Sequence, residues 1–422
     1  MGRVLIVGAG AAGMAAAIAA ARQGQSITVL ERNEKSLKKL GVTGNGRGNL
    51  LNSGDPLYYG DAGFAAQVLA RIPYGKLVQF FEELGVPLRE EAEGRIYPAA
   101  LQGAVAVDAL RLKARQLGVQ ICTRTQVIRL TAQGGGFVLE AEESVPRGEQ
   151  AKGKKALPPE KIPRMYKADQ VVVAAGGAAA PAHGTDGSAY ELLTAFGHSL
   201  TPIRPALCAL LTDRKPIQGL AGQRVRARLT LRDRLGHLLH ETQGEALFAQ
   251  DGVSGIAAMQ LARWVHDGCV LHMDLRDELN REATEAGELR DYLQTIADSR
   301  QELPLSELFT GMLMPQVGRA VLAAAGYPEQ SRRIGSLPPK ALETIAATLT
   351  DFPLAVEGLR GFDSAQVTAG GIATADFNPA TLESRLQKGL YAAGEILDVD
   401  GDCGGFNLMF AFASGLLAGG GF

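Results

Sequence analysis

A glycine-rich turn between a short apolar run and an alanine-rich stretch constrains the fold of this chain more than any other feature. Val4–Val7 is a continuous apolar run, which is typical of a parallel strand that is buried on both faces. It leads into Gly8-Ala9-Gly10-Ala11-Ala12-Gly13, and strong helix formers follow from Met14 to Arg22. A second apolar run, Ile27–Leu30, ends at Glu31. This order predicts a unit of strand, tight turn, helix and strand.

The same layout is typical of a dinucleotide-binding fingerprint, in which an acid follows the glycines by roughly 20 residues. Gly8 would permit the tight turn, Gly10 would let a pyrophosphate approach the backbone, and Gly13 would let helix and strand pack closely. The helix N-terminus offers N–H groups to phosphates, and Glu31 can accept a hydrogen bond from a ribose hydroxyl. An ordinary βαβ turn is the alternative. A secretory signal peptide is disfavoured because three glycines interrupt the apolar run.

Composition narrows the class of protein. A length of 422 residues suggests two or three domains, and a net charge of −2 gives no argument for nucleic acid or an anionic membrane surface. Four irregularly spaced cysteines without a C-x-x-C pair fit a reducing cytoplasm and argue against disulfides or structural zinc. No apolar run reaches the roughly 18 residues of a membrane helix. We expect a cytoplasmic protein with a small-molecule substrate, no nucleic-acid partner, no metal and no membrane span. Oligomeric state and completeness of the C-terminus stay open.

A second glycine-rich loop follows the first unit. Gly41–Asn49 contains donors but few side chains that could build a core. A flexible surface loop is one interpretation. Because the stretch follows a dinucleotide unit directly, we favour the other: its backbone passes close to a flat or phosphorylated ligand, and Arg47 supplies charge.

The middle of the chain divides into two kinds of pattern. Helical periodicity covers 64–84, broken at Pro73, and 105–117, and three alternating segments (126–131, 137–142, 166–169) predict an antiparallel meander with a loop over 147–161. The run Gln170–Gly177 predicts another buried parallel strand. Later segments predict strands at 208–211, 225–231 and 237–241, and then helices at 256–265, 288–297, 305–309, 316–325 and 340–349. Because these helices do not alternate with strands, we interpret 195–352 as an inserted domain.

The chain then returns to the first pattern. Leu390–Glu395 is a buried strand that ends in an acid, and Asp402–Asn407 opens a final helix over 408–418. A glycine pair at a helix N-terminus can receive an anion, although a plain turn is the alternative. The fold class predicted is α/β, a Rossmann-like domain with a parallel sheet and a β-meander, interrupted by a β-barrel-like plus helical domain. The predicted domains are 1–194, 195–352 and 353–422.

Five stretches together resemble one family. They are Gly8–Gly13, Gly44–Asn49, Val171–Gly177, Val367–Ile372 and Gly389–Asp398 with Gly404–Leu408. Their order and spacing resemble the bacterial flavoproteins that include BaiN-type reductases and aminoacetone oxidases, within the glutathione-reductase-like FAD superfamily. The resemblance spans nearly the whole chain. It is specific for the family and much less so for a substrate.

The resemblance implies FAD bound in extended form. The pyrophosphate would lie at the first turn, the adenosine ribose at Glu31, the adenine at the backbone of Val127 and the pyrimidine edge of the flavin at the start of the last helix. The residues that it assigns to the cofactor are Gly8, Gly10, Ala11, Ala12, Gly13, Glu31, Arg32, Gly44, Gly46, Arg47, Gly48, Asn49, Val127, Ala174, Ala175, Gly176, Gly394, Glu395, Gly405, Phe406, Asn407 and Leu408.

Departures from the family pattern leave the catalytic residue unassigned. Gly48 and Leu51 replace a Cys and a Thr of the family loop, and Ala249-Gln250 stands where a Thr-His pair is common. Cys403 in its glycine turn is most simply a small filler.

The resemblance implies an FAD-dependent oxidoreductase, and we expect it to reduce an activated C=C or C=O bond with electrons from NAD(P)H. No second glycine fingerprint is visible for a nicotinamide, so either NAD(P)H docks transiently on the flavin or oxygen or another carrier exchanges the electrons. The insert would cover the flavin. Three alternatives stay open: an oxygen-dependent oxidase of a small amine or aminoketone, a flavin-binding sensor without turnover, and a plain NAD dehydrogenase. A plain NAD dehydrogenase would be colourless when purified.

Overall fold

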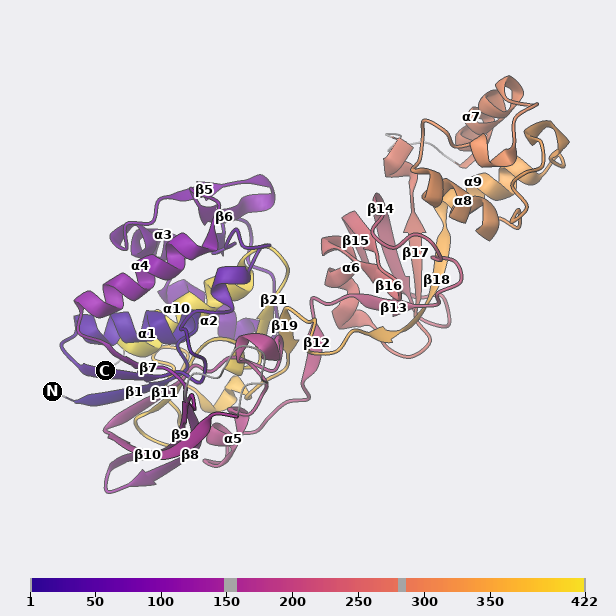
Figure 1. Cartoon of the computed structure of the whole chain (residues 1–422). Helices are drawn as coiled ribbons and strands as arrows, with labels where there is room; N and C mark the ends of the chain where they lie inside the picture. Colours follow the sequence, from indigo (N-terminus) through magenta and orange to yellow (C-terminus); the bar gives the residue numbers. More distant parts are fainter. Residues whose placement is uncertain (1, 148–157, 280–285, 421–422) are drawn as a thin grey trace. The chain divides into compact units, whose positions relative to one another are not determined.

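The structure is a computed structural model that describes residues 2–147, 158–279 and 286–420. It divides into two compact units, the first of Met1–Arg204 with Gln366–Phe422 and the second of Pro205–Ala365 (Figure 1). The second unit therefore begins and ends later than the insert of 195–352 expected from the sequence. The difference at the C-terminal end arises because a barrel strand, β18 (Phe352–Leu359), belongs to the second unit.

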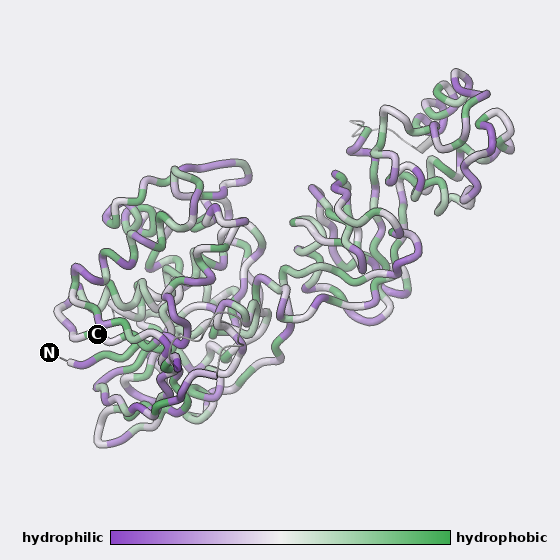
Figure 2. The backbone as a smooth tube through the Cα atoms, in the orientation of Figure 1, coloured by the Kyte–Doolittle hydropathy of each residue, from purple (hydrophilic) through white to green (hydrophobic). Residues whose placement is uncertain are grey.

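A five-stranded parallel sheet lies at the centre of the first unit, in the order β20-β11-β1-β2-β7. Its strands are β1 (Arg3–Val7), β2 (Ser26–Leu30), β7 (Gln120–Cys122), β11 (Gln170–Val173) and β20 (Leu390–Ala392). Val7 pairs with both Leu30 and Val173, so three strands end at one edge. The Rossmann-like prediction is confirmed. Figure 2 shows β1 and its neighbours as hydrophobic.

Two helices pack on each other unusually closely beside this sheet. They are α1 (Ala11–Arg22) and α10 (Phe406–Gly420). A Cβ atom added to Gly415 would lie 2.2 Å from the carbonyl oxygen of Ala12, and one on Gly419 would lie 2.2 Å from that of Ala16. Small residues on both helices thus let the backbones touch. The remaining helices of this unit are α2 (Ala62–Arg71), α3 (Tyr74–Glu83), α4 (Gly103–Gln116) and α5 (Tyr190–Thr194).

The predicted meander is present as a three-stranded antiparallel sheet, and its strands are longer than expected. They are β8 (Thr125–Gln133), β9 (Gly136–Val145) and β10 (Glu160–Ala168). Most of the loop expected over 147–161 lies outside the described residues. The shorter strands of the unit are β3 (Leu51–Asn52), β4 (Tyr58–Gly60), β5 (Leu88–Glu90), β6 (Arg95–Pro98), β19 (Val367–Ala369) and β21 (Val399–Gly401). Strand β12 (Arg204–Ala206) spans the division between the two units.

The second unit contains a closed barrel of six strands in the order β13-β16-β15-β14-β17-β18. Besides β18, its strands are β13 (Leu210–Thr212), β14 (Arg224–Arg232), β15 (Leu238–Phe248), β16 (Gly252–Ser254) and β17 (Val270–Asp274). Its helices are α6 (Ile256–Leu261), α7 (Ala286–Ser299), α8 (Pro315–Ala324) and α9 (Ala341–Thr350). The barrel-plus-helices prediction is confirmed, but the expected helix 305–309 is a 3-10 turn over Leu305–Glu307. Among the described residues we find no helix with the length and apolarity needed to cross a bilayer.

Candidate functional site

A cavity opens at the carboxyl ends of β1, β2 and β11. Gly8 and Ala175 line it where the first and third of these strands end, and Glu31 and Arg32 line it beyond β2. Val127 of β8 lines it from the meander. These five residues are among those predicted to hold a cofactor. In an open parallel sheet, this edge is where ligands bind.

The three glycines of the first turn differ in the space around them. Gly8 has φ +98°, and a Cβ atom there would lie 2.6 Å from the carbonyl oxygen of Ala174. A Cβ atom on Gly13 would lie 1.9 Å from the carbonyl oxygen of Gly8, whereas one on Gly10 would meet nothing within 4 Å. The first N–H groups of α1 have no partner inside the helix. The turn therefore offers open space at Gly10 next to free donors, as a pyrophosphate requires.

Glu31 is buried and ties the first turn to the end of β2. Its carboxylate accepts hydrogen bonds from Ala9 N at 2.8 Å, Asn33 N at 2.7 Å and Asn33 Nδ2 at 2.8 Å. A carboxylate offers about four acceptor sites, so about one remains for a ligand hydroxyl. Glu31 can therefore hold a ribose while it also fixes the turn.

One wall of the cavity comes from a segment that the sequence analysis did not assign. Gly184, Asp186, Gly187 and Ser188 line it. The signal that could have indicated this wall is the run of small and turn-forming residues directly after the buried strand β11. Thr125, Gln126 and Leu192 also line the cavity and were not predicted.

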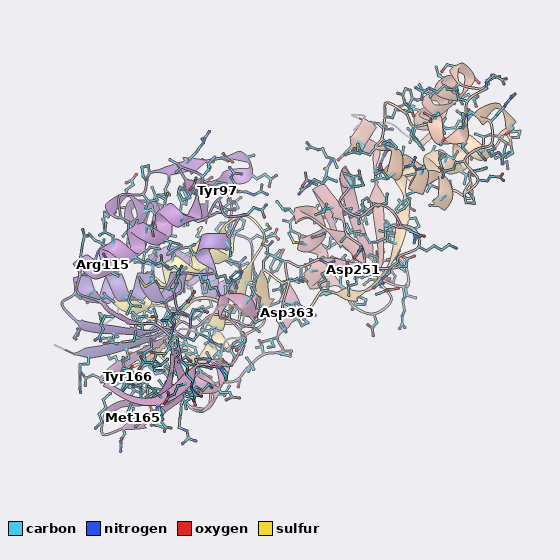
Figure 3. All side chains as sticks on the ribbon, in the orientation of Figure 1. Tyr97, Arg115, Met165, Tyr166, Asp251 and Asp363 are labelled. Atoms are coloured by element: carbon cyan, nitrogen blue, oxygen red, sulfur yellow. The ribbon has the colours of Figure 1, made fainter. Side chains whose placement is uncertain are left out.

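The second glycine loop is packed more tightly than a flexible surface loop would be. A Cβ atom on Gly48, which has φ +74°, would lie 2.6 Å from Gly103 Cα at the start of α4. Arg47 forms an ion pair with Glu91, and its guanidinium lies 4.4 Å from the ring centre of Tyr97 (labelled in Figure 3). The Arg47 side chain is thus held by protein groups. Its expected role toward a phosphate stays a prediction.

The same loop meets the start of α10. The buried Oδ1 of Asn49 has no hydrogen-bond partner, and it lies 2.8 Å from the position of a Cβ atom on Gly405. Asn407 exchanges two hydrogen bonds with the backbone of Gly401, at 2.8 and 2.7 Å, so its side chain shapes the preceding turn. The backbone N–H groups of Phe406, Asn407 and Leu408 lie in the first turn of α10. They have no acceptor within the helix, so they can donate hydrogen bonds to a ligand.

Gly394 and Glu395 join the returning part of the chain to the first turn. Gly394 has φ +78°, and a Cβ atom there would lie 2.8 Å from Ala12 Cβ. Glu395 pairs with Lys39 and accepts a hydrogen bond from Thr368 N at 2.9 Å. Ala174 and Gly176 continue from β11, and the latter has φ +79°. Contacts therefore connect all the predicted stretches within the first unit, although only five of the assigned residues line the cavity.

These features fit a dinucleotide cofactor such as FAD. The open space at Gly10 leaves room for a ligand. The remaining acceptor site on Glu31 and the unpartnered Oδ1 of Asn49 can each accept a hydrogen bond from it.

Comparison with known proteins identifies the family. A family model described as the HI0933-like protein Rossmann domain matches residues 2–421. The chain belongs to the HI0933-like family. It is 35% identical to the 3-dehydro-bile acid delta(4,6)-reductase of Clostridium scindens, over 99% of this chain and 98% of that protein. It is 24% identical to the ribosomal RNA dihydrouridine synthase of Escherichia coli, over 97% of this chain and 95% of that protein.

Among solved structures, this HI0933-like protein is similar to the open conformation of a flavocytochrome c3 fumarate reductase. The TM-score is 0.47 at 16% identity, over 100% of this chain and 78% of that one. The family match and the bile-acid reductase confirm the resemblance drawn from the motifs, and with it an FAD-dependent oxidoreductase.

A metal site and the Cys403 thiol are two other reactive centres to consider in the described part of this HI0933-like protein. It holds no group of three or more His, Cys, Asp or Glu residues that could bind a metal ion. Burial raises the pKa of the Cys403 thiol to about 11, so this cysteine stays protonated and is a poor nucleophile at neutral pH.

Proposed function

We propose that the protein uses FAD to reduce an activated C=C or C=O bond of a small organic substrate, with NAD(P)H as the electron donor. The observation that carries the proposal is the whole-length similarity, at 35% identity, to a protein named as a reductase of a 3-dehydro-bile acid. That name favours an enone, in which a carbonyl activates the neighbouring C=C bond. The choice of NAD(P)H as the electron donor is supported by the sequence interpretation alone.

Bound FAD would supply the hydride-transfer chemistry, and the chain would supply binding and electrostatics. The N–H groups that open α1 would bind the pyrophosphate beside Gly10, and Glu31 would accept a hydrogen bond from the ribose. The N–H groups that open α10 carry a partial positive charge, which favours negative charge at the flavin's pyrimidine edge. Asn49 Oδ1 is buried and has no hydrogen-bond partner. It would accept a hydrogen bond from the pyrimidine edge of the flavin.

Ribosomal RNA is a second candidate substrate because of the relative from E. coli. Charge argues against it. The second unit, residues 205–365, carries 21 acidic and 17 basic side chains. Two exposed arginines of its strand β14, Arg224 and Arg228, pair with Glu245 and Glu241. An RNA-binding surface needs unneutralised cations for the phosphates. A small molecule is therefore the substrate class that we propose.

The test begins with the visible spectrum of the freshly purified protein, which should show bound flavin. Anaerobic mixing with NADH and with NADPH should bleach the flavin, and a conjugated steroid enone should then restore its colour. The matched control is the corresponding steroid ketone without the conjugated C=C bond. This ketone should not restore the flavin colour.

Other outcomes would replace the proposal. A colourless protein would exclude a resident flavin. Flavin that is reduced by a small amine and reoxidised by air with stoichiometric peroxide would indicate an oxidase, and flavin that no donor reduces would indicate a sensor. Dihydrouridine formed in unmodified ribosomal RNA by the NAD(P)H-reduced protein would indicate the RNA activity.

A further inference from the structure

The segment 178–188, called the strap below, follows β11 and supplies one wall of the cavity. Asp186 and Ser188 of the strap line the cavity together with Arg32 from the end of β2. Asp186 Oδ1 lies 2.6 Å from Arg32 Nη1. We infer that Asp186 is a positioning residue that holds Arg32 and thereby keeps the strap closed over the adenosine end of the cofactor. The inference rests on the FAD site proposed above.

Side chains from the stretch after β2 fasten the strap along its length. Asn33 Nδ2 donates to the carbonyl of His183 at 3.0 Å, and Lys38 Nζ donates to the carbonyl of Ala182 at 2.8 Å. A third donor is Lys39 Nζ, which lies 3.4 Å from the carbonyl of Ala179. All three bonds end on backbone oxygens. Among the described contacts between these two stretches, Arg32 with Asp186 is the one pair of opposite charges.

The two ends of the strap are held differently. At its start, Thr368 Oγ1 accepts hydrogen bonds from Ala178 N at 2.8 Å and Ala179 N at 2.9 Å, and this threonine is buried. The far end is held by Asn33 and by Arg32, whose Nη1 also lies 3.4 Å from Ser188 Oγ. The base is thus anchored in the interior. The far end is also tied to the base by a hydrogen bond from Gly187 N to the carbonyl of Gly177 at 3.1 Å, and the ion pair with Arg32 adds to this bond at the cavity.

The ion pair lies where the cavity meets solvent. The side chains of Arg32 and Asp186 are 33% and 36% exposed, yet both line the cavity. Opening this pair would therefore widen the cavity toward solvent. A planar guanidinium held at such a wall can also cover the face of an aromatic base.

Protein groups on both sides orient the Asp186 carboxylate. It accepts hydrogen bonds from Ser188 Oγ at 2.6 Å and Ser188 N at 3.1 Å, as well as from Arg32. Burial acts to raise the pKa of Asp186, but the hydrogen bonds from Arg32 and Ser188 outweigh it and leave the pKa below its ordinary value. Asp186 is therefore ionised at neutral pH.

A purely structural role predicts a different pattern of effects. A partly exposed ion pair contributes little to the stability of a fold. If Asp186 only stabilised the fold, its replacement would change little, and the small change would appear equally in apoprotein and holoprotein. If Asp186 keeps the strap closed, its replacement speeds cofactor release and leaves the melting temperature of the apoprotein unchanged.

The experiment follows FAD release from the full-length holoprotein by the rise in flavin fluorescence after dilution. Asp186→Asn should release FAD about two- to fivefold faster, which is the effect expected from the loss of one partly exposed ion pair. Asp186→Glu should restore part of the retention. The matched control is Glu83→Gln, which breaks the pair of Glu83 with Arg22 at 2.9 Å, with side chains 41% and 34% exposed. This control should release FAD at the wild-type rate.

Salt provides a second measurement on the same proteins. Raising the ionic strength should speed release from the wild type, because it screens a partly exposed pair, and should affect Asp186→Asn much less. Wild-type release from a yellow Asp186→Asn protein would overturn this inference alone, as would a fall in apoprotein melting temperature that accounts for faster release. A wild type that binds no FAD would overturn the proposed site as well. Retained FAD that NAD(P)H cannot reduce would contradict the proposed reaction and leave this inference standing.

Discussion

Lys39 Nζ lies 2.8 Å from Glu395 Oε2, although the two residues are 356 positions apart in the chain. Their side chains are only 24% and 19% exposed. Gly394, the neighbour of Glu395, packs against Ala12 in the first turn of α1. Glu395 is therefore close to the place where the pyrophosphate is expected. A carboxylate beside two phosphates would need a cation, and Lys39 is placed to supply it.

Lys39→Met should weaken FAD binding by about 1–2 kcal/mol, a value between those of surface and buried ion pairs. Titration of the apoprotein with FAD measures this loss. Lys39→Met/Glu395→Gln should regain part of the affinity, because the uncompensated charge is then gone. The control is Lys76→Met in α3, an exposed lysine whose Nζ donates to the carbonyl of Arg71 at 3.1 Å. A double variant as weak as Lys39→Met would show that Lys39 instead binds the cofactor directly.

Gly10 and Gly13 should separate cofactor binding from folding. Gly10 has φ −82° and ψ −167°, which alanine adopts without strain, and its Cβ would enter open space. Gly10→Ala should therefore change stability by less than about 0.5 kcal/mol and weaken FAD binding by about tenfold or more, about 1.4 kcal/mol. Gly13→Ala should destabilise the apoprotein by about 1–3 kcal/mol through overpacking. Urea denaturation and FAD titration distinguish the two. Equal effects on both measurements would contradict this division.

The strands of the central sheet were predictable because of their burial. Val4–Val7 and Val171–Val173 are at most 6% exposed, and a strand buried on both faces is apolar at every position. β7 was not predicted, because it is a three-residue strand at the sheet edge whose first residue, Gln120, is exposed. β18 was not predicted for another reason: its alternating burial begins at Phe352-Pro353, and a proline inside a segment argues against a strand.

The partners of the site residues were not predictable in the same way. A local pattern such as Gly8–Gly13 shows which backbone conformation the chain needs, and the structure places these glycines as that pattern requires. The pairs Arg32–Asp186 and Lys39–Glu395 join stretches 154 or more positions apart, and nothing in either local sequence indicates its partner. Arg47 is a further example, because its glycine-rich neighbours in the sequence do not indicate its pairing with Glu91.

The second glycine loop offers a matched pair of substitutions. Gly46 and Gly48 have φ +83° and +74°, so alanine at either position should cost about 1–2 kcal/mol from the left-handed conformation. Gly48→Ala should lower the free energy of unfolding by about 1–3 kcal/mol more than Gly46→Ala does. The added Cβ at position 48 would clash with the backbone of Gly103, whereas the one at position 46 has no atom within 4 Å. Urea midpoints of the two apoproteins test the difference. Equal losses would show that the start of α4 gives way easily.

His198 should make the first unit sensitive to acid. The residue is buried, stacks on Phe377 at 4.4 Å, and its Nε2 lies 2.9 Å from Ser384 Oγ. Burial lowers the pKa of His198 below its ordinary value of 6.5, and Asp376, with Oδ2 3.8 Å from Nδ1, opposes this only in part. The unfolded chain therefore binds the proton at a higher pH than the folded chain does. The stability from neutral His198 is complete above that ordinary value and is lost as pH falls through it.

The measurement is the urea midpoint of the apoprotein between about pH 8 and 5, on either side of the ordinary histidine value. His198→Gln should be less stable than the wild type at the upper end by about 1 kcal/mol, the net value of one hydrogen bond, and the gap should narrow toward the lower end. Ser384→Ala is the control, because it removes the hydroxyl partner but keeps the titrating ring, so its stability should fall with pH at least as steeply as that of the wild type. A gap between the wild type and His198→Gln that stays constant across the range would show that His198 does not titrate there.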